Sequence, residues 1–389
     1  MRQGWETKNI EEIFDLQMGK TPDRDNSSFW GGDNIWISIS DLDYNSKYVS
    51  TSKEKITNSA IKESGIKCVK KGTVIMSFKL SIGKVAIADT DLYTNEAIMS
   101  FKIKDGYNIY APYIYYYLKG YKWNGANKAV MGLTLNKRAI AINKFCFPNI
   151  SIQESIANEL DCLSIIIDKK KKQLEELDKL AQAIFYDMFG DPITNEKGWE
   201  MKNLEGICDI SSSKRIFANE YTETGIPFYR GKEITEKSKG SEISVELYIS
   251  HERYNEIKEN YGVPQIGDIL LTAVGTIGNM WVVNSNEPFY FKDGNILWLK
   301  LKKQYNPIFF KELLNILISK HKAQMANGCA YNALTIVNLK KMPTSIVPFE
   351  MQQQFSEKIE SIEKQKALIK KSLEEVETLF NSRMDYYFN

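Results

Sequence analysis

The sequence has few of the residues from which catalytic and metal centres are usually built. Its 389 residues include only two histidines and five cysteines. His251 and His321 stand singly, which favours surface or hydrogen-bonded imidazoles over a metal ligand or a general base. The cysteines (68, 146, 162, 208 and 329) contain no Cys-x-x-Cys pair, which argues against a zinc site or a disulfide framework. We expect them to be buried, small apolar side chains in a reducing compartment.

Long hydrophobic runs and an excess of one charge are also missing. No run is long enough to cross a bilayer and the first residues are polar, so we expect a cytoplasmic protein with no membrane partner. The 51 basic and 49 acidic residues leave a formal charge of only +2. Any DNA site must therefore come from local basic clusters or be shared with a more basic partner. The 43% of hydrophobic residues is enough for the cores of two or three domains.

Motifs for cofactor chemistry are missing as well. The sequence has no Asn/Asp-Pro-Pro-aromatic tetrad, which amino-methyltransferases use to hold the target nitrogen, and no Gly-x-Gly loop after a strand. Residues 19–21 (GKT) resemble the end of a phosphate loop, but Phe14 stands where that loop needs a glycine. A polar loop is the better interpretation. We predict a binding protein that has no catalytic centre and holds no cofactor itself.

Two long amphipathic helices are the strongest positive signal. Residues 152–188 contain no proline or glycine, and at 1.5 Å per residue they form a helix roughly 55 Å long. Apolar residues recur there at heptad spacing, and a second stripe of the same kind ends the chain, with Lys170 and Lys366 as interruptions. Two unrelated surface helices are the alternative. The predicted coiled-coil interface comprises Ile156, Leu160, Leu163, Ile167, Leu174, Leu177, Ile184, Phe355, Ile359, Ile362, Ile369, Leu373 and Val376.

The chain is also a tandem duplication. Residues 4–10 (GWETKNI) recur as residues 198–204 (GWEMKNL), and the Ile-Gly pair at 82–83 recurs at 277–278. The offset runs from about 194 to about 201, so two units of roughly 195 residues fill the chain. Each unit is a globular domain followed by one long helix, and the turn-rich residues 190–198 join them. Since the second helix must return along the first, we expect an antiparallel pair and a pseudo-two-fold relation between the domains.

Each globular unit combines helices with a mostly antiparallel sheet. Residues 72–88 and 267–283 are typical of β-hairpins around a glycine turn, and residues 112–120 and 307–322 are typical of helices with proline in the first turn. We predict an α+β fold: two mixed α/β domains joined by two long antiparallel coiled-coil helices. The expected ranges are 1–150 for domain one, 151–190 for helix one, 191–348 for domain two and 349–389 for helix two.

Both domains carry loops that combine basic, hydroxyl and amide side chains. Such groups make phosphate contacts and read base edges, although ordinary solvated loops have the same composition. Two comparable binding domains roughly 50 Å apart suit a duplex with separated half-sites. The candidate DNA-binding residues are Lys20, Thr21, Arg24, Lys79, Ser81, Lys84 and Lys128 in domain one, and Lys214, Arg215, Arg230, Lys232, Thr276, Asn279 and Asn332 in domain two.

Several of these segments together carry a family resemblance. They are the paired Gly-Trp-Glu starts, residues 18–22 (MGKTP), residues 36–42 (WISISDL), the two Ile-Gly pairs, and the Pro-to-Gln approaches to both long helices at 148–154 and 348–353. In their order and duplication, over essentially the whole chain, they resemble the DNA-specificity subunit of Type I restriction–modification systems. Residues 213–215 (SKR) replace the GKT of the first unit, so the two loops need not read bases alike.

The resemblance implies a division of labour. Each globular domain is expected to be a target-recognition domain that reads one half of a bipartite double-stranded DNA site, while the helices fix the unread spacer. Two modification subunits would dock on the chain, bind S-adenosylmethionine and methylate adenine in each half-site. Restriction subunits would add translocation and cleavage driven by ATP and Mg²⁺. The alternative is a non-catalytic, bivalent coiled-coil scaffold that binds proteins and never touches DNA, which the weak net charge favours.

Overall fold

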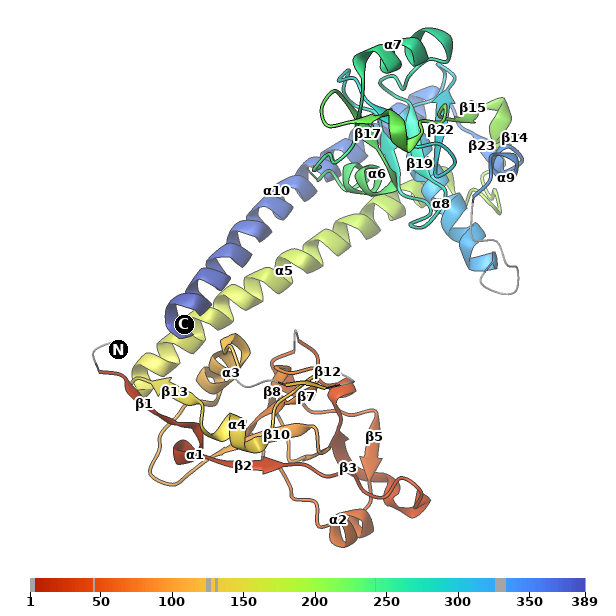
Figure 1. Ribbon diagram of the computed structural model, residues 1–389. Helices are drawn as coiled ribbons and strands as arrows, with labels where there is room; N and C mark the ends of the chain where they lie inside the picture. The colour runs from red at the N-terminus through yellow and green to blue at the C-terminus, as the bar shows by residue number, and fades with distance from the viewer. Residues whose placement is uncertain are drawn as a thin grey trace. The chain divides into compact units, whose positions relative to one another are not determined.

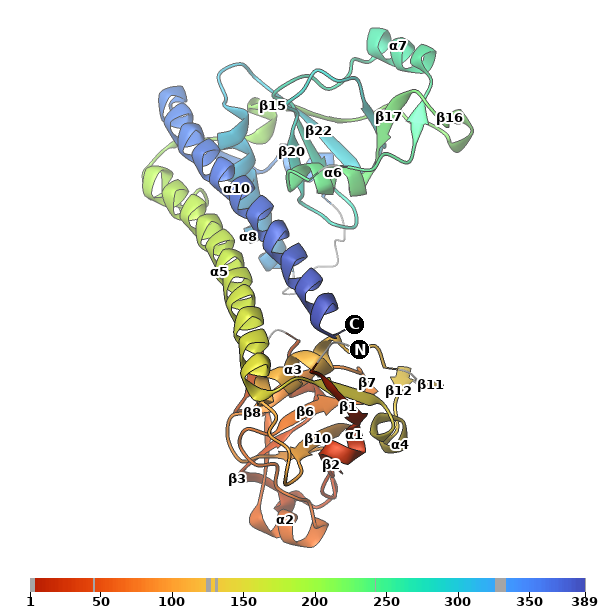
Figure 2. The same ribbon diagram turned by 90° about the vertical axis from the view of Figure 1, so that its left-hand side faces the viewer.

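The computed structural model describes residues 4–44, 46–123, 127–129, 132–241, 243–325 and 334–388, without the side chains of 127–134 and 321–325. The chain divides into two compact units (Figures 1 and 2). The first comprises Met1–Lys170 and Ser372–Asn389, and the second comprises Lys171–Lys371. Each unit thus holds one globular domain, part of one long helix and part of the other. The long helices are α5 (Ile150–Phe189) and α10 (Phe349–Phe388), each of 40 residues.

The first unit is built around a five-stranded sheet in the order β2-β10-β6-β8-β4. The first four strands are antiparallel neighbours: β2 (Phe14–Met18), β10 (Ile98–Ile103), β6 (Val74–Ser77) and β8 (Val85–Ala88). Strand β4 (Tyr48–Val49) pairs in parallel with β8 at the edge. Smaller sheets are β1-β13 (Glu6–Asn9, Lys144–Phe147), β5-β3-β9 (Glu54–Ile56, Trp30–Ile37, Tyr93–Thr94) and β11-β12-β7 (Asn127–Ala129, Gly132–Thr134, Lys79–Leu80). The helices are α1 (Ile10–Ile13), α2 (Asn58–Ser64), α3 (Ala111–Gly120) and α4 (Lys137–Ala141).

The second unit repeats the central part of this topology. Its antiparallel sheet β15-β22-β19-β20 (Cys208–Ser212, Ile296–Leu301, Ile269–Thr272, Met280–Val282) has the strand order of β2-β10-β6-β8. Its β14-β23 pair (Glu200–Asn203, Pro343–Ile346) matches β1-β13. In the sheet β16-β18-β17-β21 (Tyr221–Thr222, Tyr248–Ile249, Ile226–Tyr229, Tyr290–Phe291), the strands β18-β17-β21 match β5-β3-β9 of the first unit, with one antiparallel and one parallel pair in each, and β16 is added at the edge. The helices are α6 (Gly231–Ser238), α7 (His251–Asn260), α8 (Pro307–Met325) and α9 (Ile336–Lys340). The internal repeat and the mixed α/β fold with long helices are confirmed.

Both predicted hairpins are present, because β6 pairs with β8 and β19 pairs with β20 in antiparallel register. The predicted helices correspond to α3 and α8. One expectation about the cysteines is wrong: Cys162 is exposed on α5, whereas Cys208 is buried and Cys68 and Cys146 are half-buried. Cys162 belongs to neither apolar series of α5, which fits its exposure. Cys329 lies outside the described residues.

The two long helices run antiparallel within each unit. In the first unit the end of α10 meets the start of α5, where the Tyr387 hydroxyl donates to Glu159 Oε2 over 2.5 Å. In the second unit the end of α5 meets the start of α10, where the ring centroids of Phe185 and Phe355 are 5.6 Å apart. Lys366, which interrupts the apolar stripe, forms 2.7 Å ion pairs with Asp178 and Glu363.

The predicted coiled-coil residues are all buried or half-buried. Those nearest the globular domains are almost fully buried, namely Ile156, Leu160, Phe355, Ile359 and Ile362. The others are half-buried, as expected where a helix has one partner along a narrow stripe, namely Leu163, Ile167, Leu174, Leu177, Ile184, Ile369, Leu373 and Val376. Apolar residues off the stripe, such as Ile165 and Leu368, are exposed.

A buried glutamine attaches the start of each long helix to its domain. Gln153 in α5 donates to Pro148 O over 2.8 Å and accepts from the Tyr110 backbone N–H over 2.9 Å. Gln352 in α10 makes the same pair of bonds with Val347 O (2.7 Å) and the Asn306 N–H (2.8 Å). Both amides are at most 1% exposed. Because an unpaired buried amide is costly, these bonds restrict how the helix leaves the domain.

Aromatic packing joins both long helices to the second domain. Phe185 and Phe189 at the end of α5 pack against Phe309 of α8 and Phe355 of α10, with ring centroids 4.9 to 6.0 Å apart. All four side chains are at most 2% exposed. This cluster holds three helices at one point, so its packing fixes their separation.

Removal of one of these rings tests the packing. We expect Phe185→Ala to lower the free energy of unfolding by about 3–5 kcal/mol, since it leaves a cavity among three fully buried rings. Urea unfolding measures the change. The control is Phe217→Ala, whose side chain is 60% exposed and should cost at most about 0.5 kcal/mol. Equal losses for the two variants would contradict the role of the cluster.

Candidate nucleic-acid interface

The central hairpin of the first domain ends in a turn that a buried hydroxyl holds. Ser77, the last residue of β6, is 0% exposed. Its hydroxyl donates to Ser81 O and accepts from the Lys84 N–H over 3.0 Å, and its carbonyl accepts from the Gly83 N–H over 3.0 Å. The candidate residues Ser81 and Lys84 are therefore on a turn whose backbone is fixed from inside.

The second domain builds the same turn. Thr272, the last residue of β19, is 0% exposed, and its hydroxyl donates to Thr276 O and accepts from the Asn279 N–H over 3.0 Å. The Thr272 carbonyl accepts from the Gly278 N–H over 2.9 Å. Thr276 and Asn279 thus occupy the positions that Ser81 and Lys84 occupy in domain one. The duplication preserves the internal bonds of the turn while its outward side chains differ.

A small sheet brings a second predicted loop to the turn of domain one. Strand β7 follows directly after Phe78, and Lys79 and Leu80 pair with Thr134 and Leu133 of β12. Leu133 pairs in turn with Lys128 of β11. The backbone positions of Lys79 and Lys128, 49 residues apart by number, therefore belong to one three-stranded sheet. The Lys128 side chain lies outside the described residues, as does all of Asn332.

The loop that contains Lys20, Thr21 and Arg24 lies against the same region. The Thr21 hydroxyl donates to the Glu96 carboxylate. Burial opposes ionisation of Glu96, but the Thr21 hydrogen bond and the charges of Lys79 and Arg24 outweigh it, so the pKa of this carboxyl is lowered. Glu96 therefore accepts from Thr21 and is stabilised as a carboxylate by the charges of Lys79 and Arg24. Gly19 is required there, since a Cβ atom would lie 2.0 Å from Thr94 O.

Two of the predicted cations in domain one are bonded to other groups of the same domain. Both guanidinium ends of Arg24 donate to Glu54, over 2.6 and 3.1 Å, and the group lies 4.0 Å from the centre of the Trp30 ring. Lys84 Nζ donates to the carbonyls of Ile39 and Leu42 over 3.2 and 2.8 Å. Arg24 and Lys84 still border the turn, but their charged groups already donate hydrogen bonds to other atoms of the domain. Lys20 is on an exposed loop, and its Nζ donates to Ser64 O at the end of α2.

In domain two, Lys214 and Arg215 follow strand β15. The Lys214 N–H donates to the Tyr290 hydroxyl over 2.7 Å, and its Nζ lies 4.8 Å from the centre of the Tyr261 ring. Arg215 Nε forms a 2.8 Å ion pair with Asp293, while most of its side chain is exposed. Both residues present cations on an exposed loop at the end of the central sheet.

Arg230 and Lys232 stand at the start of α6, which is bonded to the turn. The Asn279 side-chain amide donates to the Thr235 hydroxyl over 3.0 Å. Glu246 accepts from Arg230 over 2.7 Å and from Lys232 over 2.8 Å. Hydrogen bonds from Lys232 and Arg230 lower the pKa of Glu246 to about 2. Arg230 also donates to the buried Glu233 over 2.8 Å, so protonation of Glu246 frees Lys232 from this carboxylate but leaves Arg230 paired.

The acidic partners are what the sequence did not reveal. Glu96 and Glu246 stand in loops without any recognisable pattern, and Glu246 is 14 residues from Lys232. Their roles follow only from the fold.

The candidate site is rich in hydrogen-bond donors: lysine and arginine groups, hydroxyls, side-chain amides and backbone N–H groups of the turns. Such groups suit phosphate oxygens and base edges. The part of the chain that the structure describes has no cluster of three or more His, Cys, Asp or Glu arranged to hold a metal ion.

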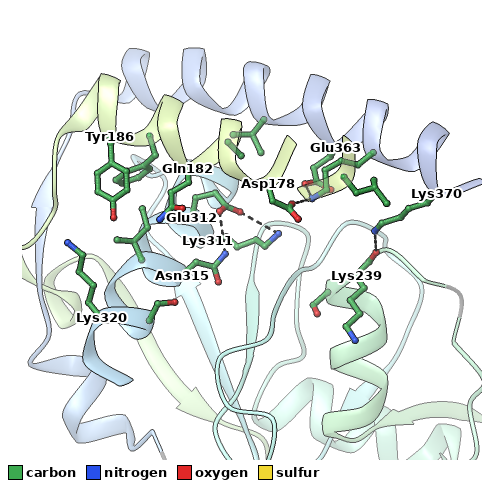
Figure 3. Close-up of a pocket in the computed structure, with 18 residues that line it drawn as sticks. Asp178, Gln182, Tyr186, Lys239, Lys311, Glu312, Asn315, Lys320, Glu363 and Lys370 are labelled. Carbon is green, nitrogen blue, oxygen red and sulfur yellow. Dashed lines mark hydrogen bonds and ion pairs between the residues drawn. The ribbon is translucent and has the colours of Figure 1, made fainter. Parts of the chain in front are cut away.

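A separate cavity of about 730 Å³ lies in the second unit (Figure 3). The C-terminal part of α5, residues 359–370 of α10, α8 and the end of α6 line it. Charged side chains surround it, including Asp178, Lys311, Glu312, Glu363 and Lys366. Figure 3 shows Asp178 and Glu363 turned toward each other from the two long helices. None of the candidate DNA-binding residues lines this cavity, which belongs to the helix junction.

Within the described ranges, no helix is long and apolar enough to span a membrane.

Comparison with known families decides how this arrangement is classified. The profile of the Type I restriction modification DNA specificity domain matches residues 2–179 and again residues 196–378. The two matches cover nearly the whole chain and coincide with its two repeats. The chain belongs to this family. The expected resemblance to specificity subunits of Type I restriction–modification systems is thereby confirmed.

A named relative agrees with this assignment. The chain is 32% identical over 257 residues to the Type I restriction enzyme MjaIX specificity subunit of Methanocaldococcus jannaschii. That alignment covers 59% of this chain and 58% of the relative, so it spans just over half the length of that protein.

Solved structures support the fold. One is the S subunit of a Type I restriction–modification system from M. genitalium, with a TM-score of 0.56, 15% identity, and coverage of 98% of this chain and 95% of that one. Another was determined for complex assembly and conformational transition of the type I R-M system, with a TM-score of 0.61, 14% identity, and coverage of 100% and 98%. At these identities the likeness concerns the fold alone.

The buried hydroxyl of the turn can be tested directly. We expect Thr272→Val to lower the free energy of unfolding by about 1–3 kcal/mol, because it leaves the Asn279 N–H and the Thr276 carbonyl without this buried partner at unchanged volume. Thermal or urea unfolding measures the loss. Thr272→Ser keeps the hydroxyl and is the matched control, and domain one already uses serine at this position. If valine were tolerated as well as serine, the hydroxyl would not hold the turn.

Proposed function

We propose that this chain is the sequence-specific DNA-binding subunit of a Type I restriction–modification complex. The observation that carries the proposal is the double family match, which falls on two domains with the same internally bonded turn. Cations, hydroxyls and amides gather around each turn, and such groups bind phosphates and base edges. The two turns have the same internal hydrogen bonds but different outward side chains, which suits two domains that read two different half-sites.

The domain assignment is part of the proposal. Residues 1–150 and 191–348 are target-recognition domains, and residues 151–190 and 349–389 are helices that set the unread spacer. The chain is a non-catalytic subunit that holds no cofactor itself. Its partners are double-stranded DNA, two modification subunits that bind S-adenosylmethionine and methylate adenine, and restriction subunits that use ATP and Mg²⁺. The long helices and the domains beside them are the docking surface for the modification subunits.

Variants that change the charge of these loops distinguish DNA binding from a role as a protein-binding scaffold. We expect Lys79→Ala to weaken binding to all duplexes alike and to lower the salt slope by about one unit. Glu246→Gln should have the opposite effect, since it removes the carboxylate that pairs with Arg230 and Lys232. One or two extra phosphate contacts would raise the slope by about 0.9 each. Competition binding by the assembled complex at two salt concentrations measures both.

An unchanged affinity and slope in both variants would remove these loops from the interface and favour the scaffold. Glu223→Gln is a matched control for Glu246→Gln, because it removes one exposed carboxylate from the same domain. It should leave the salt slope at the wild-type value.

The spacing role makes a prediction about the target itself. In cells that carry the chain and its modification subunits, methylated adenines should fall in one bipartite motif with a fixed gap. Insertion of four residues into both helices, after Gln173 and after Ser372, adds about 6 Å of helical rise. At about 3.4 Å per base pair, the gap should grow by at most two base pairs. Methylome sequencing measures the gap, and an unchanged gap in an active variant would exclude the helices as the spacer.

A further inference from the structure

Leu80, at the tip of the turn in domain one, has a backbone conformation that leucine rarely adopts. Its φ angle is 65°, in the left-handed region where the Cβ atom crowds the following carbonyl. Among the described residues, only Asn195 shares a positive φ without being glycine, and asparagine tolerates it. The Ser81 N–H donates to the Lys79 carbonyl over 2.8 Å, which closes a three-residue turn centred on Leu80. With positive φ, this is the rarer and more strained form of such a turn.

The surrounding structure is strong enough to impose this conformation. On one side Phe78 is 1% exposed, and its backbone bonds to Ala97 and Leu135 over 2.9 Å each. On the other side the buried Ser77 hydroxyl holds Ser81 and Lys84. Leu80 lies between these two fixed points. Local strain that packed neighbours maintain is typical of functional sites.

The second domain shows how the same position looks without strain. Aligned on the Ile-Gly pairs at 82–83 and 277–278, Leu80 corresponds to Gly275, whose φ is 76°. Glycine adopts this conformation at little cost. Domain one therefore retains a side chain where the backbone favours having none. The apolar residue at the tip of the second turn is instead Val274, which is 45% exposed.

The strained side chain is not used to fill the core. Leu80 is 55% exposed and lies between the candidate DNA-contacting residues Lys79 and Ser81. Burial would repay the strain of a leucine, but here most of that burial is missing from the unbound protein. A binding partner that covers the side chain would supply it. The position of Leu80 at the proposed interface makes DNA that partner.

We propose that Leu80 is a specificity-determining residue whose isobutyl group contacts the 5-methyl group of a thymine in the half-site read by domain one. This rests on the proposed function. The thymine methyl is the apolar group that base edges present in the major groove, and apolar side chains recognise it. A half-site with a methylated adenine contains at least one thymine, on the opposite strand. Leu80 therefore supplies apolar readout among groups that otherwise contact DNA through charge and hydrogen bonds.

The test removes the two contacting groups separately. The complex of this chain with its modification subunits is bound to target duplexes in which each thymine of the domain-one half-site is replaced, one at a time, by deoxyuridine. For the wild type, one replacement should weaken binding about fourfold, the effect of one buried methyl-sized group. In Leu80→Gly and Leu80→Ala complexes, the same replacement should have no effect, because the partner of the methyl group is gone.

A control variant and a stability measurement complete the design. Ile142→Ala removes a 60% exposed side chain of the same domain, where φ is an ordinary −81°, and should retain the fourfold discrimination. Leu80→Gly should melt at or above the wild-type temperature, because glycine relieves the strain. Agreement of the glycine and alanine variants in binding separates loss of the side chain from altered backbone freedom.

Three results would overturn the inference. They are equal binding of thymine and deoxyuridine duplexes by the wild type at every position, undiminished discrimination by both Leu80 variants, and a melting temperature several degrees lower for Leu80→Gly. The last would mean that Leu80 packs against its own domain. All three tests require a wild-type complex that binds its target duplex specifically. If the wild-type complex did not bind any duplex specifically, that result would contradict the proposed function and not the role of Leu80.

Discussion

The joint between each long helix and its globular domain depends on a buried side-chain amide. Gln153 and Gln352 each occupy both ends of their amide with backbone partners of the domain, within 2.9 Å. A buried amide that loses such partners pays the full cost of desolvation, so the bonds resist rotation of the helix against the domain. The direction in which each helix leaves its domain is therefore well defined. A spacer role for the helices requires such a joint, because flexibility there would blur any distance they set.

Packing between the helices supplies the second constraint. The apolar stripe is deeply buried only beside each globular domain, at Ile156 and Leu160 in one unit and at Phe355 and Ile359 in the other. Farther along, the stripe is half-buried, as a two-helix contact allows. Lys366 takes a place in the stripe because Asp178 and Glu363 satisfy its charge. Within each unit the stripe is therefore buried most deeply where the helices meet the globular domain.

Sequence patterns predicted the long helices, the repeat and the central hairpins because each of these depends on local periodicity or on self-similarity within the chain. The environment of the candidate site was not predictable in the same way. Arg24 pairs with Glu54, and Lys232 pairs with Glu246, through contacts that only the folded chain creates. Leu80 shows the limit most clearly. A turn position with positive φ favours glycine, and nothing around this leucine in the sequence signals that it adopts that angle.

The turns of the two domains also show which positions are free to vary. Ser77 and Thr272 point inward and hold their turns by bonds to backbone atoms, so these bonds do not depend on the identity of the outward side chains. Substitution of an outward residue leaves the supporting hydroxyl and its partners in place. Apart from Lys84 and Asn279, whose side chains bond to other elements, outward residues of such a turn can therefore change at little cost in folding stability. A lineage under pressure to alter its recognition could diversify here step by step, with each intermediate still folded.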